Sequence, residues 1–437
     1  MDFFSFNEGL NAGIEYCQLD YAAKLYHIVL EESGACQKPR IQNCNLILGW
    51  KQKQSIFNSL LPFQKISSFQ FSFFLGSKLG FYKLMKHYSQ IIGFWPSFYP
   101  ESYHLPDDVD NFLKSQTKSW IIKPNHGSCG RGIVVQEGKK YNGENVIMQQ
   151  YIANPMLING YKFDLRFYVL VRSIDPLCIY IYEDGLVRFA TALYIENKEN
   201  YGNISAHLTN FSVNRESNSF MVTNDVSKDG MGSKWSHKPF WPYIESIGLV
   251  SADIKKKIHD IIVSVFLIAR GEMIKQNNHR RSFELFGVDI LLDDKGNPYI
   301  LEININPALG TSSNLDMHIK KPLIRDVMNV SLIPDPSLMG SILESIIEEK
   351  QNVKLRDYII LHEFEEAEKR LGCFHRVYPT IERYDMIENS RKYRSDIFLY
   401  NWLKLDSNKK RIMRKNRHVE FVQFLKMFRN TSKSCEI

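Results

Sequence analysis

The sequence lacks any hydrophobic run long enough to cross a membrane as a helix, which takes about 20 residues. Its Phe-rich segment 69–74 is far shorter than that. The N-terminus carries acidic residues and no basic segment ahead of an apolar core, so it does not predict a secretory signal peptide. We therefore expect a protein without a membrane span.

Cysteine is scarce and shows no pattern. The seven cysteines are scattered, and no CxxC or Cys/His spacing occurs, which argues against a zinc site. An odd number of cysteines without a signal peptide suggests reduced thiols. These features predict an intracellular protein.

The sequence also lacks two common nucleotide-binding fingerprints, GxxxxGK[ST] and GxGxxG. It does contain a polar loop rich in glycine, KPNHGSCGRG, at 123–132. Glycine lets backbone N–H groups approach a phosphate, and Lys123 at the end of the preceding predicted strand can reach the same group. Taken alone, an ordinary surface loop explains this segment equally well.

What is present is the composition of a globular protein. Hydrophobic residues make up 44%, charged residues 24% and aromatic residues 13% of 437 residues, which favours packed structure and allows two or three domains. The net charge is +7, and positive charge is dense at 409–411 and 414–417. An acidic partner and a solvated helix face explain this basic end equally well. No base-reading motif favours nucleic acid.

The segment FGVDILLDDKGNPYILEININP, 286–307, predicts a β-hairpin. The turn residues 293–297 separate two apolar strands. A turn centred on 295–296 would pair Asp289 with Glu302, and Asn304 would share the face of Glu302. Two carboxylates on an apolar hairpin need compensation, and a set of oxygen ligands favours Mg²⁺. The alternative is a hairpin edge that faces solvent.

The segment KFDLRF, 162–167, predicts a strand with three charged residues on one face. Lys162, Asp164 and Arg166 alternate with apolar residues, and the apolar continuation at 168–171 indicates a central strand. Lys and Arg beside an Asp can bind phosphate oxygens while the Asp contacts a ribose hydroxyl or orients the lysine. A solvated charged face is the alternative.

Other segments are weaker signals. The strand end 149–152 precedes a linker containing Pro155 and could offer backbone groups to an adenine. The segment HLTNFS, 207–212, is rich in small hydrogen-bonding groups, for which a capping turn is the alternative. Periodicity predicts strands at 45–50, 120–124, 133–135, 145–151, 162–171 and 178–182. It predicts helices at 78–88, 251–273, 322–333 and 341–370, with Ser251 as the N-cap of the second. The segment 205–238 is predicted to be irregular.

Together these pieces resemble the tubulin tyrosine ligase-like family, and within it the polyglutamylase branch. The resemblance spans roughly residues 45–333. It rests on the segments WIIKPNHGSCGRGI, QQYIANPMLINGYKFDLRFYVLV, DGLVRFAT, HLTNFSVN, FELFGVDILLDDKGNPYILEININPAL, LDMHIKKPLIRD and GCFHRVYPT. It implies an α/β ATP-grasp fold with an N-terminal subdomain at 1–115, a central one at 116–200 and a C-terminal one at 201–335 around an ATP cleft. A basic helical extension at 336–437 would follow.

The resemblance also implies roles for individual residues. Catalytic roles would fall to Lys162, Arg166 and Arg188. ATP would be held by Lys123, Cys129, Gly130, Gln149, Gln150, Tyr151, Ile152, Lys162, Asp164, Thr209 and Asn210. Mg²⁺ would bind Asp289, Glu302 and Asn304. The incoming glutamate would meet Arg188, Ser212, Lys234 and Lys320, and Arg131 would face the acceptor peptide.

The implied reaction is ATP-dependent addition of free L-glutamate to acidic tubulin tails, in the cytoplasm and cytoskeleton, with cilium and basal body as further locations. The basic end would suit tubulin. Addition of glycine or tyrosine, a different acidic protein as acceptor, and a microtubule-binding protein without activity are the alternatives. Phe211 stands where Tyr is common in the family, and Asn306 and Leu309 lie in a segment that varies with substrate.

Overall fold

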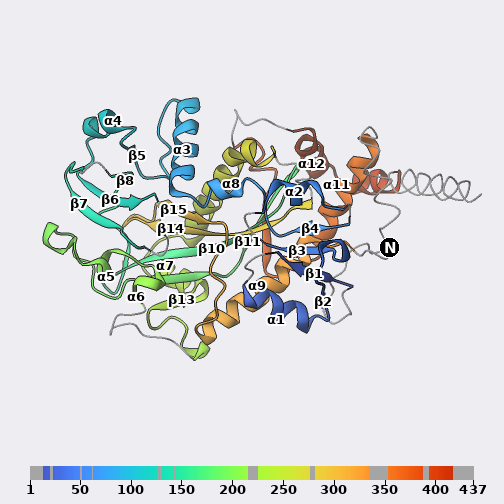
Figure 1. The fold of residues 1–437 in the computed structure, drawn as a ribbon, viewed down its shortest axis with the longest axis horizontal. Coiled ribbons are helices and arrows are strands. Elements are labelled where there is room, and N and C mark those ends of the chain that lie inside the picture. Colours follow the sequence, from blue (N-terminus) through green and yellow to red (C-terminus); the bar gives the residue numbers. More distant parts are fainter. Residues whose placement is uncertain are drawn as a thin grey trace, which may run out of the picture.

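The computed structural model describes most of the chain, and the described residues form three β-sheets (Figure 1). The described residues are 13–19, 23–49, 52–61, 63–125, 127, 130–141, 144–214, 225–275, 281–334, 353–386 and 393–416. Of the predicted site, Cys129 lies outside these residues, and the side chain of Ser212 is not described.

The first sheet is parallel and has the strand order β2-β1-β3-β4. Its strands are β1 (Glu15–Gln18), β2 (Cys36–Gln37), β3 (Leu46–Leu48) and β4 (Lys65–Ile66), and its helices are α1 (Lys24–Glu32) and α2 (Gln54–Asn58). Parallel neighbours need a crossover connection, and α1 and α2 lie in two such connections. The strand predicted at 45–50 is therefore confirmed as β3.

The second sheet is antiparallel and has the order β5-β8-β6-β7. It contains β5 (Ser102–Leu105), β6 (Ser119–Pro124), β7 (Val134–Glu137) and β8 (Val146–Gln150), and it is accompanied by α3 (Lys78–Ile92) and α4 (Val109–Lys114). Trp120, Phe112 and Met148 form its own small core. This core supports the two inner strands of the sheet, β6 and β8, which carry Lys123 and Gln149.

The third sheet is the largest and is organised by one strand. β10 (Tyr161–Ile174) pairs with β11 (Leu177–Tyr182), β12 (Leu186–Phe189) and β14 (Glu284–Leu292). The other members are β9 (Leu157–Ile158), β13 (Lys234–Ser236), β15 (Pro298–Asn304) and β16 (Phe374–Tyr378). The expectation that 162–171 forms a central strand is confirmed.

The two faces of β10 explain its sequence. Phe163, Leu165 and Phe167 pack in one core with α8 (Ser251–Met273), while Tyr168 and Leu170 pack in another core with α9 (Asn314–Ser331). The two helices accordingly cover opposite faces of the sheet (Figure 1). Lys162, Asp164 and Arg166 belong to the same face as Tyr168, so one face of the strand passes from polar to apolar along its length.

Several sequence-based boundaries are wrong in detail. Val250 is the N-cap of α8, and Ser251 is its first helical residue, with its hydroxyl donating to Glu245 at 2.6 Å. α9 begins at Asn314, well before 322, because Ser313 caps it by accepting from the Asp316 N–H at 3.2 Å. Pro322 lies inside this helix.

The segment 205–238 is more regular than predicted. It contains α5 (Ile204–His207), α6 (Phe211–Asn214), β13 and the start of α7 (His237–Ser246). The long helix predicted at 341–370 is described only from 353 onward, where α11 (Val353–Glu368) runs, and 335–352 lies outside the described residues. α12 (Arg394–Lys404) follows. The subdomain boundaries stay predictions.

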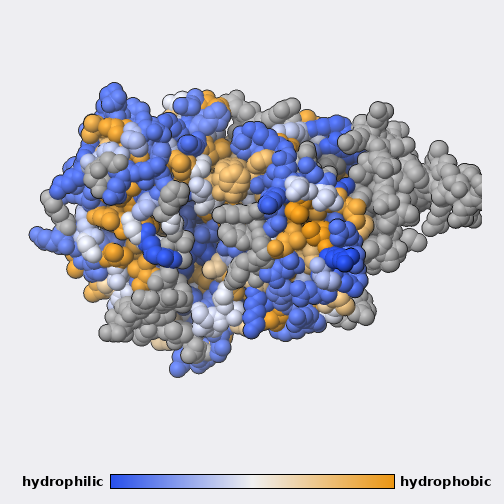
Figure 2. Space-filling view, viewed as in Figure 1, coloured by the Kyte–Doolittle hydropathy of each residue, from blue (hydrophilic) through white to orange (hydrophobic). Residues whose placement is uncertain are grey.

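The surface in Figure 2 is mainly hydrophilic, with hydrophobic residues in small groups between the polar ones. Within the described part of the chain, no helix combines the length and the apolar character needed to cross a membrane.

Candidate active site

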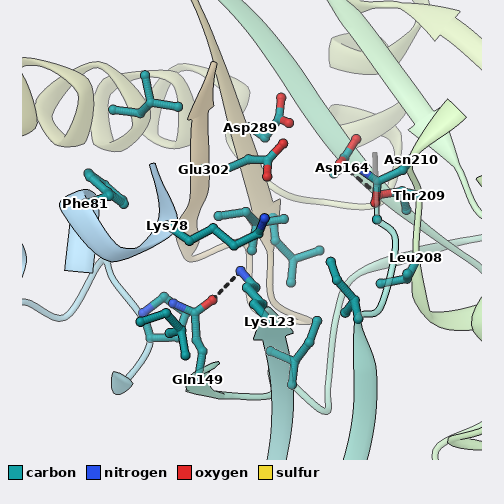
Figure 3. Close-up of a pocket in the computed structure, with 18 of the residues that line it drawn as sticks. Lys78, Phe81, Lys123, Gln149, Asp164, Leu208, Thr209, Asn210, Asp289 and Glu302 are labelled. Atoms are coloured by element: carbon teal, nitrogen blue, oxygen red, sulfur yellow. Dashed lines mark hydrogen bonds between the residues drawn. The ribbon is translucent and has the colours of Figure 1, made fainter. Parts of the chain in front are cut away.

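A cavity of about 180 Å³ lies where the second and third sheets meet, and it gathers most of the predicted site (Figure 3). Its lining includes residues from α3, from both sheets and from the segment around α5. The predicted residues in the lining are Lys123, Gly130, Gln149, Gln150, Tyr151, Ile152, Lys162, Asp164, Thr209, Asn210, Asp289, Glu302 and Asn304. Segments that are far apart in the sequence thus converge on one space.

The hairpin β14–β15 has the predicted register, in which Asp289 lies opposite Glu302. The carboxylate of Asp293 organises the turn by accepting from the N–H groups of Lys295 and Asn297 at 3.0 and 2.7 Å. Gly296 has a φ of +78°, which an L side chain rarely adopts. A bulge follows the pair, because Ile290 lies opposite Ile300, and Leu301 is left as the extra residue.

The two hairpin carboxylates lie in different electrostatic surroundings. Asp289 is 1% exposed, so the solvent-facing alternative is wrong for it. Burial opposes its ionisation, but Arg166 and Arg188 outweigh burial and hold its pKa well below the usual range. Burial and the neighbouring Asp289 raise the pKa of Glu302. The Asn304 amide joins them, donating to Glu302 at 3.2 Å and to Asp289 at 3.4 Å.

This donor set fits a hard divalent cation that is shared with a phosphate. It offers two carboxylates and one amide oxygen, and a bound cation would favour the ionised form of Glu302, whose pKa is raised first by burial and then by Asp289. Among the described residues, no three His, Cys, Asp or Glu side chains cluster as a metal site. A cation here would therefore depend on Asn304 and on ligand oxygens as well as on the two carboxylates.

The charged face of β10 is buried, and each of its charged side chains has a polar partner. Lys162, Asp164 and Arg166 are 6%, 3% and 6% exposed, so the solvated-face alternative is wrong. Arg188 donates two hydrogen bonds to Asp164, at 2.7 and 2.6 Å, because β12 pairs them directly across the ladder. Thr209 donates a further bond to the same carboxylate at 2.8 Å.

Arg166 and Arg188 face Asp289 instead of lining the cavity. Arg166 donates twice to Asp289, through Nε and through Nη2 at 2.9 Å, and Arg188 Nη2 lies 2.8 Å from Asp289 Oδ2. The two guanidiniums therefore orient the carboxylate from behind. Both hydrogen-bond sets are of the strong, charge-assisted kind.

Two lysines carry lowered pKa values inside the cavity. Burial lowers the pKa of Lys162 to about 7, with Asp164 opposing the shift and Lys123 adding to it. Burial lowers the pKa of Lys123 to about 8, with Glu302 opposing it and Lys78 adding to it. Lys123 also donates to Gln149 at 2.6 Å. A bound anion would stabilise the charged form of these lysines, because it would compensate for the hydration that burial removes.

Lys78 is a site residue that the sequence analysis missed. It is the first residue of α3 and points into the space between Lys123 and Glu302 in Figure 3. Its ammonium donates to the backbone oxygen of Gly127 at 2.8 Å, which joins α3 to the glycine-rich loop. No local pattern marks this residue, since the loop that it contacts is 49 positions away in the sequence.

Tyr151 and His207 extend the site behind Lys162. The ammonium of Lys162 donates to the Tyr151 hydroxyl at 3.0 Å, and that hydroxyl lies 2.7 Å from His207 Nδ1. His207 Nε2 lies 3.0 Å from the backbone oxygen of Asn200, which can only accept. Nδ1 is therefore the acceptor for Tyr151. Burial and then Lys162 lower the pKa of His207, which keeps the ring neutral.

A second cationic group lies outside the cavity lining. Lys234 and Lys320 both bond Asp316, at 2.9 and 2.8 Å, and Lys320 also donates to the Gly310 oxygen at 2.7 Å. Asp316 is fully buried and was not predicted. Lys320 has a pKa lowered to about 8 by burial, with Asp316 opposing the shift. Arg131, predicted to face the acceptor, is exposed.

Fold and cavity together define a class of α/β protein that presents buried lysines opposite paired carboxylates. The chain belongs to the tubulin-tyrosine ligase family, whose model matches residues 56–339. This membership confirms the family resemblance and the predicted α/β class with an ATP-grasp-like fold.

Curated relatives add detail to that assignment. Human tubulin monoglutamylase TTLL4 is 36% identical over 297 residues, which is 65% of this chain and 24% of the relative. Mouse tubulin polyglutamylase TTLL5 is 35% identical over 290 residues, which is 64% of this chain and 22% of the relative. Mouse tubulin polyglutamylase TTLL6 is 33% identical over 350 residues, which is 72% of this chain and 42% of the relative. The names of these relatives support the predicted branch, although the chain spans less than half the length of each.

Proposed function

We propose that this protein is an ATP-dependent ligase that joins glutamate to glutamate side chains, or to growing glutamate branches, on tubulin tails. The observation that carries the proposal is the convergence in one cavity of Lys123 and Lys162 with the opposed pair Asp289 and Glu302. Family membership and the names of the relatives support the substrate.

The chemistry begins with an acceptor carboxylate. Its oxygen attacks the γ-phosphorus of ATP, the bond from that phosphorus to the bridging oxygen breaks, and ADP leaves behind an acyl phosphate. The amine nitrogen of glutamate then attacks the acyl carbon, phosphate leaves, and the nitrogen loses a proton as the amide forms. Phosphoryl transfer of this kind depends on positioning and charge neutralisation, so no protein nucleophile is required.

The residues of the cavity would divide these tasks. Lys123, Lys162 and Lys78 would neutralise the phosphates, because their ammonium groups lie in or beside the same cavity. Asp289, Glu302 and Asn304 would hold Mg²⁺, which when bound supplies positive charge to the phosphate oxygens. Arg166 and Arg188 would fix the orientation of Asp289.

The adenine and ribose would occupy the remaining lining. The strand end 149–152 would contact adenine, and Asp164 with Thr209 would contact the ribose, since both line the cavity and already share a hydrogen bond. Gly130 lies against Asn210, where an added Cβ would come within 3.2 Å of its side-chain oxygen. The loop and this segment would therefore close over the nucleotide together.

Lys234 and Lys320 support glutamate as the incoming amino acid. The two ammonium groups converge on one buried carboxylate, Asp316, and would offer positive charge to an acidic side chain. The basic residues 409–411, Arg414 and Lys415, in the described part of the C-terminal region, would attract acidic tails. We place the protein with its proposed substrate on the cytoskeleton, including the cilium and basal body.

The test is incorporation of amino acids into tubulin tails, measured by mass spectrometry after incubation with ATP. We expect glutamate to be incorporated by the wild type and by Asp294→Asn, an exposed control on the same hairpin, and to be lost in Glu302→Gln. Incorporation of glycine or tyrosine without glutamate would identify a different ligase of this family. Equal behaviour of wild type and Glu302→Gln would instead support a microtubule-binding protein without this activity.

A further inference from the structure

A second cavity, of about 380 Å³, lies on the opposite face of the third sheet from the active site. Its position follows from β10, because Phe167 lines this cavity while the neighbouring Arg166 contacts Asp289 on the other face. Part of its wall comes from 372–375 in the segment GCFHRVYPT, to which the proposed function assigns no role. The cavity is thus separate from the cleft proposed for ATP.

The inner wall of the second cavity is apolar and largely aromatic. Phe167 from β10 and Trp241 from α7 are buried and belong to the core on the α8 side of the sheet, whereas Tyr182 and Phe374 pack in the α9-side core and border the cavity where β11 pairs with β16. Ile181 completes this wall. Such a surface suits the flat apolar part of a small molecule.

Three hydrogen-bond donors lie beside this wall. Lys255 and His259 are one turn apart on α8, and the His375 ring from β16 lies 5.0 Å from that of His259, measured between centroids. The ammonium of Lys255 lies 4.7 Å from the centroid of Trp241. In the described part of the chain, no hydrogen bond engages the ring nitrogens of the two histidines.

The charged groups around these three donors leave them able to bond a ligand. Burial, followed by His375, lowers the pKa of His259 to about 3, and burial also lowers that of His375, so each ring is neutral and offers one N–H. Arg383 is paired with Asp260 at 2.8 Å, and Asp260 also bonds Lys256. The lining carboxylate, Glu183, is exposed at the rim.

The rim of the cavity is held in place by a buried carboxylate. The Cys373 N–H donates to Asp326 at 2.9 Å. Gly372 has a φ of +54°, and an added Cβ would lie 2.2 Å from the carboxyl carbon of Asp326. The segment is therefore tightly packed and shaped before any ligand arrives.

We propose that this cavity is a second ligand site, which takes a small organic anion with a flat apolar group. The carboxylate or phosphate monoester of that anion bonds Lys255, His259 and His375, while its apolar part packs against Trp241 and Phe167. The inference does not rest on the proposed ligase activity.

The test uses the full chain with a non-hydrolysable ATP analogue at saturation, so that the first cavity is blocked. Phenyl phosphate and benzoate are titrated separately by calorimetry, and the preferred one distinguishes a phosphate from a carboxylate ligand. We expect one binding site, and imidazole NMR signals of His259 and His375 that shift on titration.

Variants then locate the site. Lys255→Met and His375→Gln should each weaken binding about tenfold or more, as expected for loss of a hydrogen bond to a charged group. Lys257→Met, an exposed lysine on the same helix that bonds Asn297 at 3.2 Å, should leave binding unchanged. If His375→Gln does not fold, comparing the affinities of Lys255→Met and Lys257→Met for the probe still tests the proposal. The proposal is overturned if neither probe binds with the analogue present, or if these two lysine variants bind equally.

Discussion

Replacing Asp289 with Asn should destabilise the protein strongly, whatever reaction it catalyses. Asp289 is 1% exposed and accepts from Arg166 and Arg188. Arg188 would keep its two hydrogen bonds to Asp164, but Arg166 bonds only Asp289 among the described residues. The substitution would therefore leave one buried guanidinium without its counter-charge.

The size of the effect follows from this geometry. Breaking a buried ion pair by removing one partner costs about 3–5 kcal/mol. In a chain of 437 residues that unfolds as one unit, that corresponds to a fall in the thermal midpoint of about 3–5 °C. Asp294→Asn, at an exposed position on the same hairpin, should change stability by less than about 0.5 kcal/mol.

A double-mutant cycle makes this reasoning testable. Asp289→Asn, Arg166→Met and the double variant would be compared by chemical denaturation, with the thermal midpoint as a second readout. The double variant should be more stable than Asp289→Asn alone, because no guanidinium is then left unpaired. If Asp289→Asn is as stable as Asp294→Asn, or if the two single losses simply add, the buried pair does not stabilise the fold as argued.

Three further predictions follow from the same structure. The pKa values of Lys123 and Lys162, about 8 and 7, should rise when phosphates bind, so calorimetry in several buffers should show uptake of about 1.4 protons per ATP at pH 8 and almost none at pH 6. An absent difference between the two pH values would contradict the lysine assignment. Gly372→Ala should lower the thermal midpoint sharply because its Cβ meets a carboxylate, whereas Gly271→Ala, with open space in a helix, should stabilise by about 0.5–1 kcal/mol. If the proposed ligase activity is correct, Asp316→Asn should raise the KM for glutamate more than it lowers kcat, since it loosens the two lysines that it bonds; an unchanged KM would argue against that role.

Local rules were enough to predict on which face of the hairpin and of β10 each side chain lies. Side chains alternate between the faces of a strand, so the spacing of Asp289, Glu302 and Asn304 determines their common side once the turn at 293–297 is recognised. The same alternation places Lys162 and Phe163 on opposite faces of β10. These inferences need only nearest neighbours in the sequence. The pairing of Asp289 with Glu302 also depends on the bulge, because between the bulge and the turn Ile290 lies opposite Ile300.

Local rules did not determine the helix boundaries. Helix starts depend on which side chain caps the first turn, and both Ser251 and Ser313 are chemically able to do so. In the structure, Ser251 bonds Glu245 and only Ser313 acts as a cap. The bulge at Leu301 was equally invisible, since it depends on how β15 pairs with β14.

By itself the sequence determined the family, the paired carboxylates and the faces on which the charged residues lie, because motifs and strand periodicity are short-range properties. Tertiary structure alone decided their partners. Arg166 meets Asp289 across 123 positions, Lys234 meets Asp316 across 82, and Lys78 meets Gly127 across 49. The first contact exists because β10 pairs with β14, the second because α9 packs against β13, and the third because α3 lies beside the glycine-rich loop, and no local pattern specifies these arrangements.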